Sequence, residues 1–215
     1  MLQTLKFSTK KQNIFFTSDF HYNHNPNWPT PIWKMRGHES VEESNEFIIK
    51  TVNETVGRHD ILFHLGDLTL NCTEQQLNNF IDRLNCRTIY CLAGNHNSPT
   101  NFIYRNELTK LGIGADQELY PLRYKNLIFL PQYVEVSVDG QFMVLNHYPQ
   151  LSWNKKTHNA IHCCGHEHGQ IKSLNADCKI NKILDVGWDN FKKPLSFKEI
   201  MYIMSKKQNI GAGHH

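Results

Sequence analysis

Short apolar runs alternate with segments of helical periodicity through the first half of the chain. Three runs are apolar and β-prone, which predicts buried strands at residues 14–18, 61–65 and 88–93. Three further segments carry apolar positions at helical spacing, which predicts helices at residues 41–56, 73–84 and 100–111. Ser40 precedes the first of these helices as a candidate N-cap, and Thr73 stands at the start of the second. The alternation of strand and helix predicts βαβ units with parallel strands.

The second half of the chain has a different pattern. Residues 133–138 and 141–146 alternate between apolar and polar positions around Asp139-Gly140, which predicts a β-hairpin. Two more short apolar runs predict strands at residues 160–164 and 182–186, and Ser196 is placed to cap a helix that ends near residue 204.

A helix-rich first half and a hairpin-rich second half predict the α/β fold class. We expect a four-layer α/β/β/α sandwich, in which two mixed sheets pack together with helices outside. The chain shows no repeat, linker or low-complexity segment, so residues 1–210 are predicted to form a single domain. Residues 211–215 (GAGHH) resemble the remnant of a histidine tag, and we exclude them from the functional argument.

Composition places the chain among ordinary globular proteins. It has 215 residues, 40% of them apolar and 20% charged, and a domain of this size buries about 70% of its unfolded surface without needing disulfides. The six cysteines form no C-x-x-C pair, which favours reduced thiols over a disulfide framework. We find no signal-peptide pattern and no apolar stretch of the roughly 20 residues that a membrane helix needs. We therefore expect a cytoplasmic protein.

The charge of the chain does not favour a highly charged partner. A formal net charge of +3 is too small to indicate binding to a membrane, and nucleic acid stays possible without support from charge. The oligomeric state has no signature in the sequence. The 13 histidines are more informative, because histidine is the commonest metal ligand among side chains.

Side chains that bind metal ions follow five of the predicted strands. The segments are Asp19-Phe20-His21, Gly66-Asp67, Gly94-Asn95-His96, Asn146-His147 and Gly165-His166-Glu167-His168. Ligands gather outside the carboxyl ends of strands in α/β sheets. In an extended segment, residues two apart point to the same face, so each D-x-H or H-x-H pair is expected to converge on one centre. The glycines are expected to let the backbone approach a bound ion.

The donor atoms in these segments are carboxylate, amide and imidazole, without a thiolate. This set suits Mn, Fe, Zn or Ni better than a structural zinc site, and a carboxylate can bridge two ions about 3.5–4 Å apart. Each segment alone has an ordinary explanation: Gly-Asp commonly marks a turn, and a lone histidine commonly belongs to the core. Five such segments, each at a strand end, favour a two-metal centre.

The ordered set resembles the motifs of the calcineurin-like metallophosphoesterase superfamily, over residues 14–204. The segment 185–189 (DVGWD) and His24 are similar to its small bacterial and phage-type members. The resemblance implies that Asp19, His21, Asp67 and His168 hold one ion. It implies that Asp67, Asn95, His147 and His166 hold the second. Two positions depart from the family pattern: Asn97 replaces the usual acidic residue after Gly-Asn-His, and Asn146 replaces the usual glycine.

The resemblance further implies a two-metal-dependent hydrolase of phosphate esters. Its catalytic residues would be Asp67, which bridges the ions, and His96, which protonates the leaving oxygen. The nucleophile would be a water that bridges the ions, and Mn is the expected metal. Two alternatives stay open: a protein phosphatase of the same superfamily and a non-catalytic scaffold with the same fold.

The short chain leaves no room for a large capping domain, which favours a small phosphoester or nucleotide-like substrate over a long partner. The loop at residues 22–38 follows the first motif, so His24 and Arg36 are candidate substrate contacts. Trp28 and Trp33 either stack on a base or pack the loop onto the core. The same two possibilities apply to Tyr148, Trp153 and Trp188.

Overall fold

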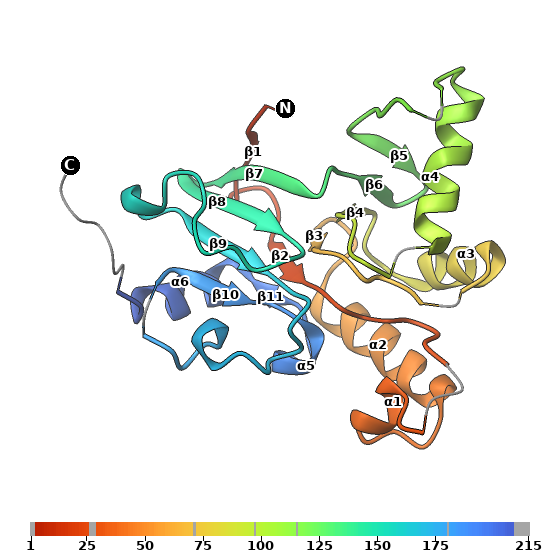
Figure 1. The fold of residues 1–215 in the computed structure, drawn as a ribbon, viewed down its shortest axis with the longest axis horizontal. Helices are drawn as coiled ribbons and strands as arrows, with labels where there is room; N and C mark the ends of the chain where they lie inside the picture. The colour runs from red at the N-terminus through yellow and green to blue at the C-terminus, as the bar shows by residue number, and fades with distance from the viewer. Residues whose placement is uncertain are drawn as a thin grey trace.

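Two mixed β-sheets pack face to face and form the centre of the molecule (Figure 1). The computed structural model describes residues 3–25, 29–70, 72–96, 98–114, 116–179 and 181–208. The six-stranded sheet has the order β11-β2-β3-β4-β6-β5, and the five-stranded sheet has the order β1-β7-β8-β9-β10. The predicted α/β sandwich of two mixed sheets is confirmed.

The strands of the six-stranded sheet are β2 (Ile14–Thr17), β3 (Ile61–His64), β4 (Thr88–Cys91), β5 (Leu122–Tyr124), β6 (Leu127–Phe129) and β11 (Leu195–Ser196). Those of the five-stranded sheet are β1 (Leu5–Phe7), β7 (Tyr133–Val138), β8 (Gln141–Asn146), β9 (Ile161–Cys164) and β10 (Ile183–Asp185). The α-helices are α1 (Ile32–Met35), α2 (Val41–Thr55), α3 (Glu74–Arg83), α4 (Ser98–Lys110), α5 (Trp188–Phe191) and α6 (Phe197–Ser205). Two 3₁₀ helices, η1 (Lys156–His158) and η2 (Lys172–Leu174), complete the described elements.

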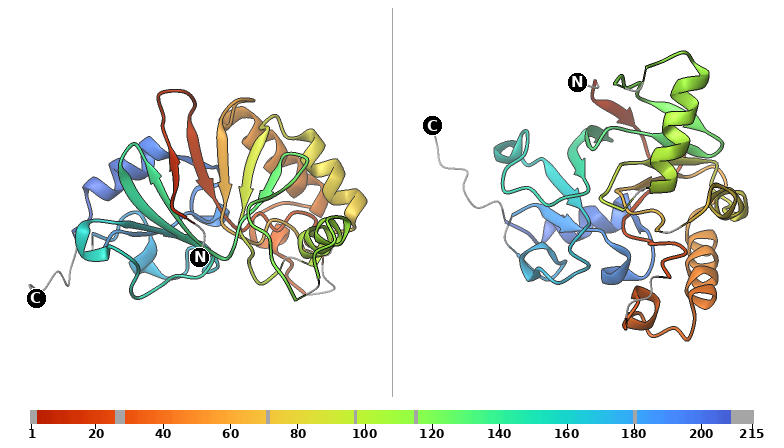
Figure 2. Two further views of the ribbon diagram at one scale, coloured as in Figure 1. Left: turned by 90° about the horizontal axis from the view of Figure 1, so that it is seen from above. Right: turned by 45° about the vertical axis from the view of Figure 1, so that its right-hand side comes forward.

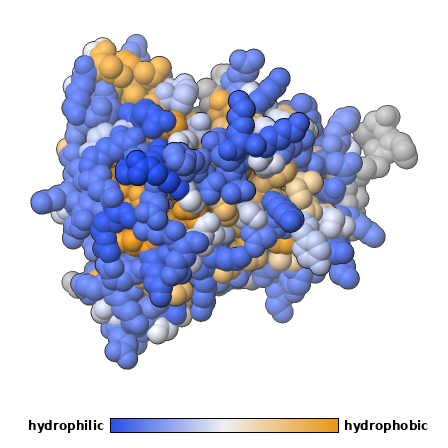
Figure 3. All heavy atoms as spheres, turned by 180° about the vertical axis from the view of Figure 1, so that it is seen from behind, coloured by the Kyte–Doolittle hydropathy of each residue, from blue (hydrophilic) through white to orange (hydrophobic). Residues whose placement is uncertain are grey.

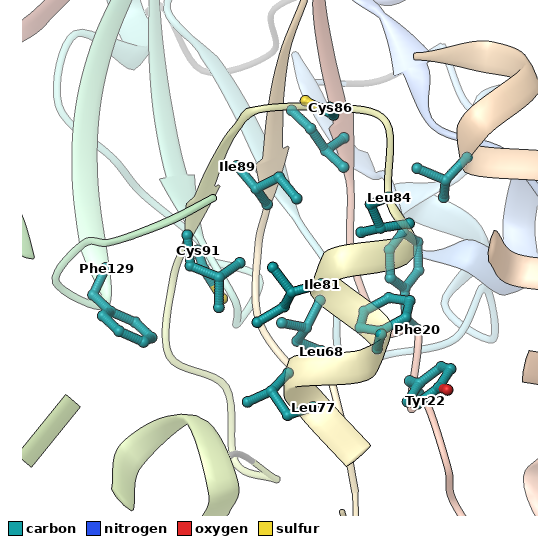
Figure 4. Close-up of a cluster of buried hydrophobic side chains, with 14 of the residues drawn as sticks. Phe20, Tyr22, Leu68, Leu77, Ile81, Leu84, Cys86, Ile89, Cys91 and Phe129 are labelled. Carbon is teal, nitrogen blue, oxygen red and sulfur yellow. The ribbon is translucent and has the colours of Figure 1, made fainter. Parts of the chain in front are cut away.

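The outer face of the six-stranded sheet is covered by α2, α3 and α4 (Figures 1 and 2). Figure 4 shows Leu77 and Ile81 of α3 in the buried cluster that includes Ile89 of β4. Because β2 and β3 are parallel and covered on both faces, all their residues are buried. Both predicted caps are present: Ser40 accepts a hydrogen bond from the Glu43 N–H (3.1 Å), and Thr73 forms a capping box with Gln76.

The core between the sheets is apolar and rich in aromatic rings. Phe16, Phe63 and Tyr90, from three adjacent strands, stack with centroid distances of 5.2 Å and 4.9 Å. The facing strand β7 alternates between partly exposed and buried residues, as its sequence predicts. Helix α6 contributes Ile200 and Met204 to this core, so the end of the chain helps to hold the sheets together.

The outer face of the five-stranded sheet has a thinner cover, from η1, η2 and the loops around them. Trp153 is buried there, and its indole N–H donates to the Ala160 carbonyl at 3.0 Å. The neighbours Cys163 and Cys164 point to opposite faces of β9, into the inner and outer clusters respectively. All six cysteines are free, as the sequence predicts, although Cys72 and Cys178 are only partly buried.

Several short elements have no counterpart among the predictions from sequence. They are β1, β5, β6, β11, α1 and α5, each two to four residues long, which is too short for a periodicity to appear. The face opposite that of Figure 1 is mostly hydrophilic with apolar patches (Figure 3). Among the described residues, no helix combines the length and the apolar character that crossing a membrane requires.

Candidate metal centre

The five predicted motifs meet where the carboxyl ends of parallel strands from both sheets come together. The loop after β2 runs beside the loop after β3: the Asp19 N–H donates to Gly66 and the His21 N–H to Asp67, both at 3.0 Å. On the other sheet, the Gly165 N–H donates to the His147 carbonyl at 2.9 Å. These backbone hydrogen bonds fix the loops that carry the candidate ligands.

Five of the seven candidate ligands have left-handed backbone conformations. Their positive φ angles are 58° for Asp19, 48° for His21, 54° for Asp67, 73° for His166 and 49° for His168. The expectation that D-x-H and H-x-H are extended segments is therefore wrong, because tight turns rather than strand alternation aim these side chains inward. Such a conformation costs about 1–2 kcal/mol per residue, and strain of this kind clusters at functional sites.

The seven side chains form two adjoining groups. Ligand atoms of Asp19, His21 and His168 lie within 4.8 Å of one another, and so do those of Asp19, Asp67 and His147. The structure thus places Asp19 close to both groups. All seven predicted ligands reach this region, because Asn95 and His166 join the second group as described below.

Asp67 lies between the two groups. Its Oδ2 atom is 3.6 Å from Nε2 of His21 and 3.5 Å from Nε2 of His147. Its Oδ1 atom accepts the backbone N–H of His96 at 2.8 Å. Oδ1 of Asp67 is therefore hydrogen-bonded to the backbone of His96, the candidate general acid. Oδ2 faces one imidazole from each group.

Asn95 holds the outer part of the second group. Its Oδ1 atom is 2.9 Å from Nε2 of His147 and 3.0 Å from Nδ1 of His166. The other ring nitrogen of His147, Nδ1, lies 2.9 Å from the Leu65 carbonyl, which points Nε2 into the site. Tyr148 packs edge-on against His166 with a centroid distance of 4.7 Å.

The electrostatics of the centre follow from burial and from the mutual approach of its groups. Burial raises the pKa of the Asp19 carboxyl to about 6. Burial also opposes ionisation of Asp67, but contact with His147 and the hydrogen bond from the His96 N–H hold the pKa of this carboxyl below its ordinary value. Burial lowers the pKa of His21 well below its ordinary value, which keeps this imidazole neutral as a metal ligand must be.

The residues present fit a bound metal ion. Oδ1 of Asp19 and both ring nitrogens of His21 are buried and find no hydrogen-bond partner among the residues that the structure describes. Buried polar atoms normally have partners, because an unsatisfied group costs free energy. A cation next to these atoms would satisfy them, and the donor set of carboxylates, one amide and imidazoles suits Mn, Fe, Zn or Ni.

Glycine is required at Gly66, Gly94 and Gly165, because side chains of candidate ligands come too close for a Cβ atom there. A Cβ atom on Gly94 would lie 2.2 Å from Oδ1 of Asp67, and one on Gly165 would lie 2.4 Å from Oδ2 of Asp19. From the sequence, the glycines are expected to let the backbone approach an ion. At Gly94 and Gly165 they admit the carboxylates of the candidate ligands.

Arg36, predicted to contact substrate, is engaged within the protein. Its guanidinium donates to both carboxylate oxygens of Asp189 at 2.7 Å and 3.0 Å, and to the carbonyls of Asp19 and Phe20 at 2.7 Å each. The side chain is only 5% exposed. Asp189 in turn lies 2.6 Å from Nδ1 of His168, so these contacts favour a positioning role for Arg36.

This chain of contacts links the first motif to the last. Because Nδ1 of His168 bonds to Asp189, Nε2 is left to serve as the ligand atom, which is a common arrangement for metal-binding histidines. Burial lowers and the contact with Asp189 raises the pKa of His168, and the net shift is upward. Asp189 lies within the family-like segment 185–189, but the sequence alone does not indicate its role.

A cavity of about 460 Å³ opens beside the first group. His24 and His96 line it together with His21 and His168. Burial lowers the pKa of His24 to about 4, so its imidazole is neutral near pH 7. The position of His24 is consistent with the predicted substrate contact, which stays a prediction.

The aromatic candidates divide between core packing and the site. Trp188 is 1% exposed and packs edge-on against Phe20, and Trp153 is 7% exposed in the outer cluster, so both pack in the core. Trp33 is partly buried, and Tyr148 borders the site. Trp28, Asn97 and residues 211–215 lie outside the described residues, so the expectations for them stay predictions.

Comparison with known proteins supports the fold alone. No protein-family model matches the sequence, and no curated protein matches it. Among solved structures, the chain is similar to the crystal structure of a protein of unknown function from Aquifex aeolicus, with a TM-score of 0.60 and 18% identity. The similarity covers 89% of this chain and 99% of that one. At this identity it shows a shared fold and carries no information about activity.

Proposed function

We propose that this chain is a metal-dependent phosphoesterase of the calcineurin-like metallophosphoesterase superfamily, acting on a small nucleotide-like phosphodiester or phosphomonoester. The observation that carries the proposal is the position of Asp67. One of its carboxylate oxygens lies 3.6 Å and 3.5 Å from imidazoles of two ligand groups. A carboxylate shared by two ions requires this placement, and paired ions are typical of phosphoester hydrolysis.

Each ion has four candidate ligands. One ion would be held by Asp19, His21, Asp67 and His168, and the other by Asp67, Asn95, His147 and His166. Mn is the first candidate metal, and Fe, Zn and Ni suit the same donors. When bound, two such ions supply Lewis acidity toward the phosphoryl oxygens and a water nucleophile at neutral pH.

Side chains around the ligands supply proton transfer and orient the ligands. The hydrogen bond from the His96 N–H to Asp67 fixes His96 relative to the centre, and the imidazole faces the cavity. As the P–O bond to the alcohol breaks, His96 gives its proton to the alcohol oxygen while the oxygen of water stays on phosphorus. Asp189 and Arg36 orient His168.

Hydrolysis of bis-p-nitrophenyl phosphate and p-nitrophenyl phosphate tests the proposal, with Mn²⁺ added to chelator-treated protein. We expect Mn²⁺-dependent release of p-nitrophenol that falls more than about 100-fold in Asp67→Asn, since losing even a supporting residue of a metal ligand costs about 10–100-fold. Asp82→Asn, on the exposed side of α3, is the matched control and should retain full activity. Mn²⁺ binding without turnover of either ester, also with Ni²⁺, Zn²⁺ or Fe²⁺, would favour the scaffold.

The role of His96 is tested by the leaving group of the ester. An alkyl alkoxide needs a proton as it departs, whereas p-nitrophenolate does not. For His96→Ala, we therefore expect a loss of about 10²–10⁴-fold on an alkyl phosphate and a much smaller loss on p-nitrophenyl phosphate. Equal losses on both esters would assign His96 to phosphate binding instead of proton transfer.

A further inference from the structure

We propose that the cavity beside the metal centre binds the alcohol group of the substrate, and that this group combines an apolar, ring-sized body with a further negative charge. The inference rests on the proposed function, because it takes the phosphate to lie at the metal centre. It adds the chemical class of the group attached to that phosphate and names the residues that select it.

The position of the cavity ties it to the departing alcohol. Its inner wall contains His21, His96 and His168, so it begins at the first ligand group. His96 is the residue assigned to protonate the leaving oxygen, and a general acid must lie within hydrogen-bond reach of that oxygen. The alcohol that carries this oxygen is therefore directed into the cavity.

Three apolar side chains also line the cavity. Ile32 and Met35 come from α1, and Leu70 comes from the loop after β3. None of the residues of α1 is buried, and Met35 is 66% exposed. One exposed apolar side chain is ordinary, but Met35 lies with the partly exposed Ile32 and Leu70 in the lining of one concave surface, which favours contact with an apolar ligand group.

The cavity has room for a ring system. Its volume is about 460 Å³, which lies within the roughly 300–1,000 Å³ typical of pockets for small organic ligands. A methyl or ethyl ester would leave most of the apolar surface of the cavity in contact with water. An aromatic or nucleoside-like group would cover Ile32, Met35 and Leu70, and burying such surface favours binding.

The cavity lining contains one lysine without an ion-pair partner among the described residues, Lys192. Asp189 lines the cavity, but its carboxylate already contacts Arg36 and His168. Lys192 is exposed at the C-terminal end of α5 and makes no ion pair with any residue that the structure describes. An anionic substituent on the far side of the ligand would meet this ammonium group.

Binding of phosphonates, which cannot be hydrolysed, tests the inference without requiring turnover. Titration calorimetry on the Mn²⁺-loaded protein would compare methylphosphonate with 1-naphthylmethylphosphonate. We expect the naphthyl compound to bind at least about tenfold more tightly, since burying a few methylene-sized groups has an effect of this order. In Met35→Ala, the ratio of the two dissociation constants should fall toward one.

Matched controls separate the cavity from general surface effects. Leu151 is 97% exposed and does not line the cavity, so Leu151→Ala should keep the wild-type ratio. For the charge, benzylphosphonate is compared with 4-carboxybenzylphosphonate. Lys192→Gln should remove an advantage of about two- to fivefold for the carboxylated compound, the range expected of an exposed ion pair, and Lys198→Gln in α6 should not.

The outcomes distinguish this inference from the proposed function. Equal affinity for the methyl and naphthyl compounds, no binding of either, or a preference that Met35→Ala leaves intact would overturn the inference. Turnover of p-nitrophenyl esters without a naphthyl preference would remove the cavity assignment and keep the hydrolase. A naphthyl preference that depends on Met35, in a protein that hydrolyses no ester, would keep the cavity as a ligand site and remove the hydrolase.

Discussion

Two buried histidines, His21 beside the metal centre and His162 in β9, have opposite surroundings. His162 is fully buried with both ring nitrogens satisfied: Nδ1 lies 3.1 Å from the Val144 carbonyl, and Nε2 accepts the Gln150 N–H at 3.1 Å. His21 is 6% exposed, and neither of its nitrogens has a hydrogen-bond partner among the described residues. Its Nε2 instead faces a carboxylate oxygen of Asp67 at 3.6 Å.

The difference identifies His162 as a structural histidine and supports His21 as a candidate ligand, because His21 also faces the carboxylate of Asp67. Burying a polar ring is tolerated when the protein supplies hydrogen bonds, as around His162. Around His21, the ring nitrogens and the carboxylate oxygens of Asp19 and Asp67 lie close together but form no hydrogen bonds with one another. This arrangement is expected of ligands around a cation. His162 accepts a hydrogen bond from the Gln150 backbone, whereas His21 has no such bond among the described residues.

The largest expected effect is on Mn²⁺ affinity, and it tests the difference between His21 and His162 directly. In His21→Ala, the affinity for Mn²⁺ should fall more than about 100-fold, because loss of a mere supporting residue costs about 10–100-fold. In His162→Gln, it should stay within about twofold, because the hydrogen bonds of that imidazole go to backbone groups and not to any candidate ligand. Equilibrium dialysis with elemental analysis measures both. Unchanged Mn²⁺ binding in His21→Ala would remove the distinction between the two histidines.

His168 is the intermediate case, since one of its nitrogens is satisfied and the other faces the centre. Asp189→Asn should lower Mn²⁺ affinity by about 10–100-fold through loss of the carboxylate that orients this ring. Arg36→Lys should have a smaller effect in the same direction, because lysine cannot bond both oxygens of Asp189. Asp82→Asn serves as the control, and the dissociation constant for Mn²⁺ from equilibrium dialysis is the measurement. Wild-type affinity in Asp189→Asn would show that His168 needs no such support.

Much of the fold is predictable from sequence because its long elements have clear periodicity. The segment predicted as a helix at residues 41–56 forms α2 (Val41–Thr55), and the predicted hairpin forms β7 and β8. Elements of two to four residues, such as β5 and α1, have no comparable signal. Their positions are set by packing against distant parts of the chain.

The candidate ligands could be found from sequence because they follow predicted strands in a fixed order. The supporting contacts could not, because the partner of Arg36 is Asp189, 153 positions later, and no local pattern connects them. The left-handed backbone of His21 and His168 is equally invisible in the sequence. His162 lies within a predicted strand and His21 follows one, but only the structure shows that the ring nitrogens of His162 are satisfied and those of His21 are not.

The smallest expected effect is on the pH dependence of the free energy of unfolding, and it tests whether His162 has a structural role. Burial lowers the pKa of His162 from its usual 6.5 to about 4, so the unfolded chain binds a proton more readily than the folded one. The stability that this residue contributes is therefore present above pH 6.5 and is lost as the pH falls toward 4. Between pH 7 and 5.5, the loss should be about 1 kcal/mol.

Urea denaturation of the metal-free protein at the two pH values measures this loss, with His162→Gln as the reference. Because every other titrating group is common to both proteins, the pH dependence of their difference belongs to His162. The advantage of the wild type should shrink by about 1 kcal/mol between pH 7 and 5.5. A constant difference would mean that the folded protein accommodates a charged ring at this position. Together with unchanged Mn²⁺ binding in His162→Gln, a shrinking difference would mean that His162 acts through folding alone.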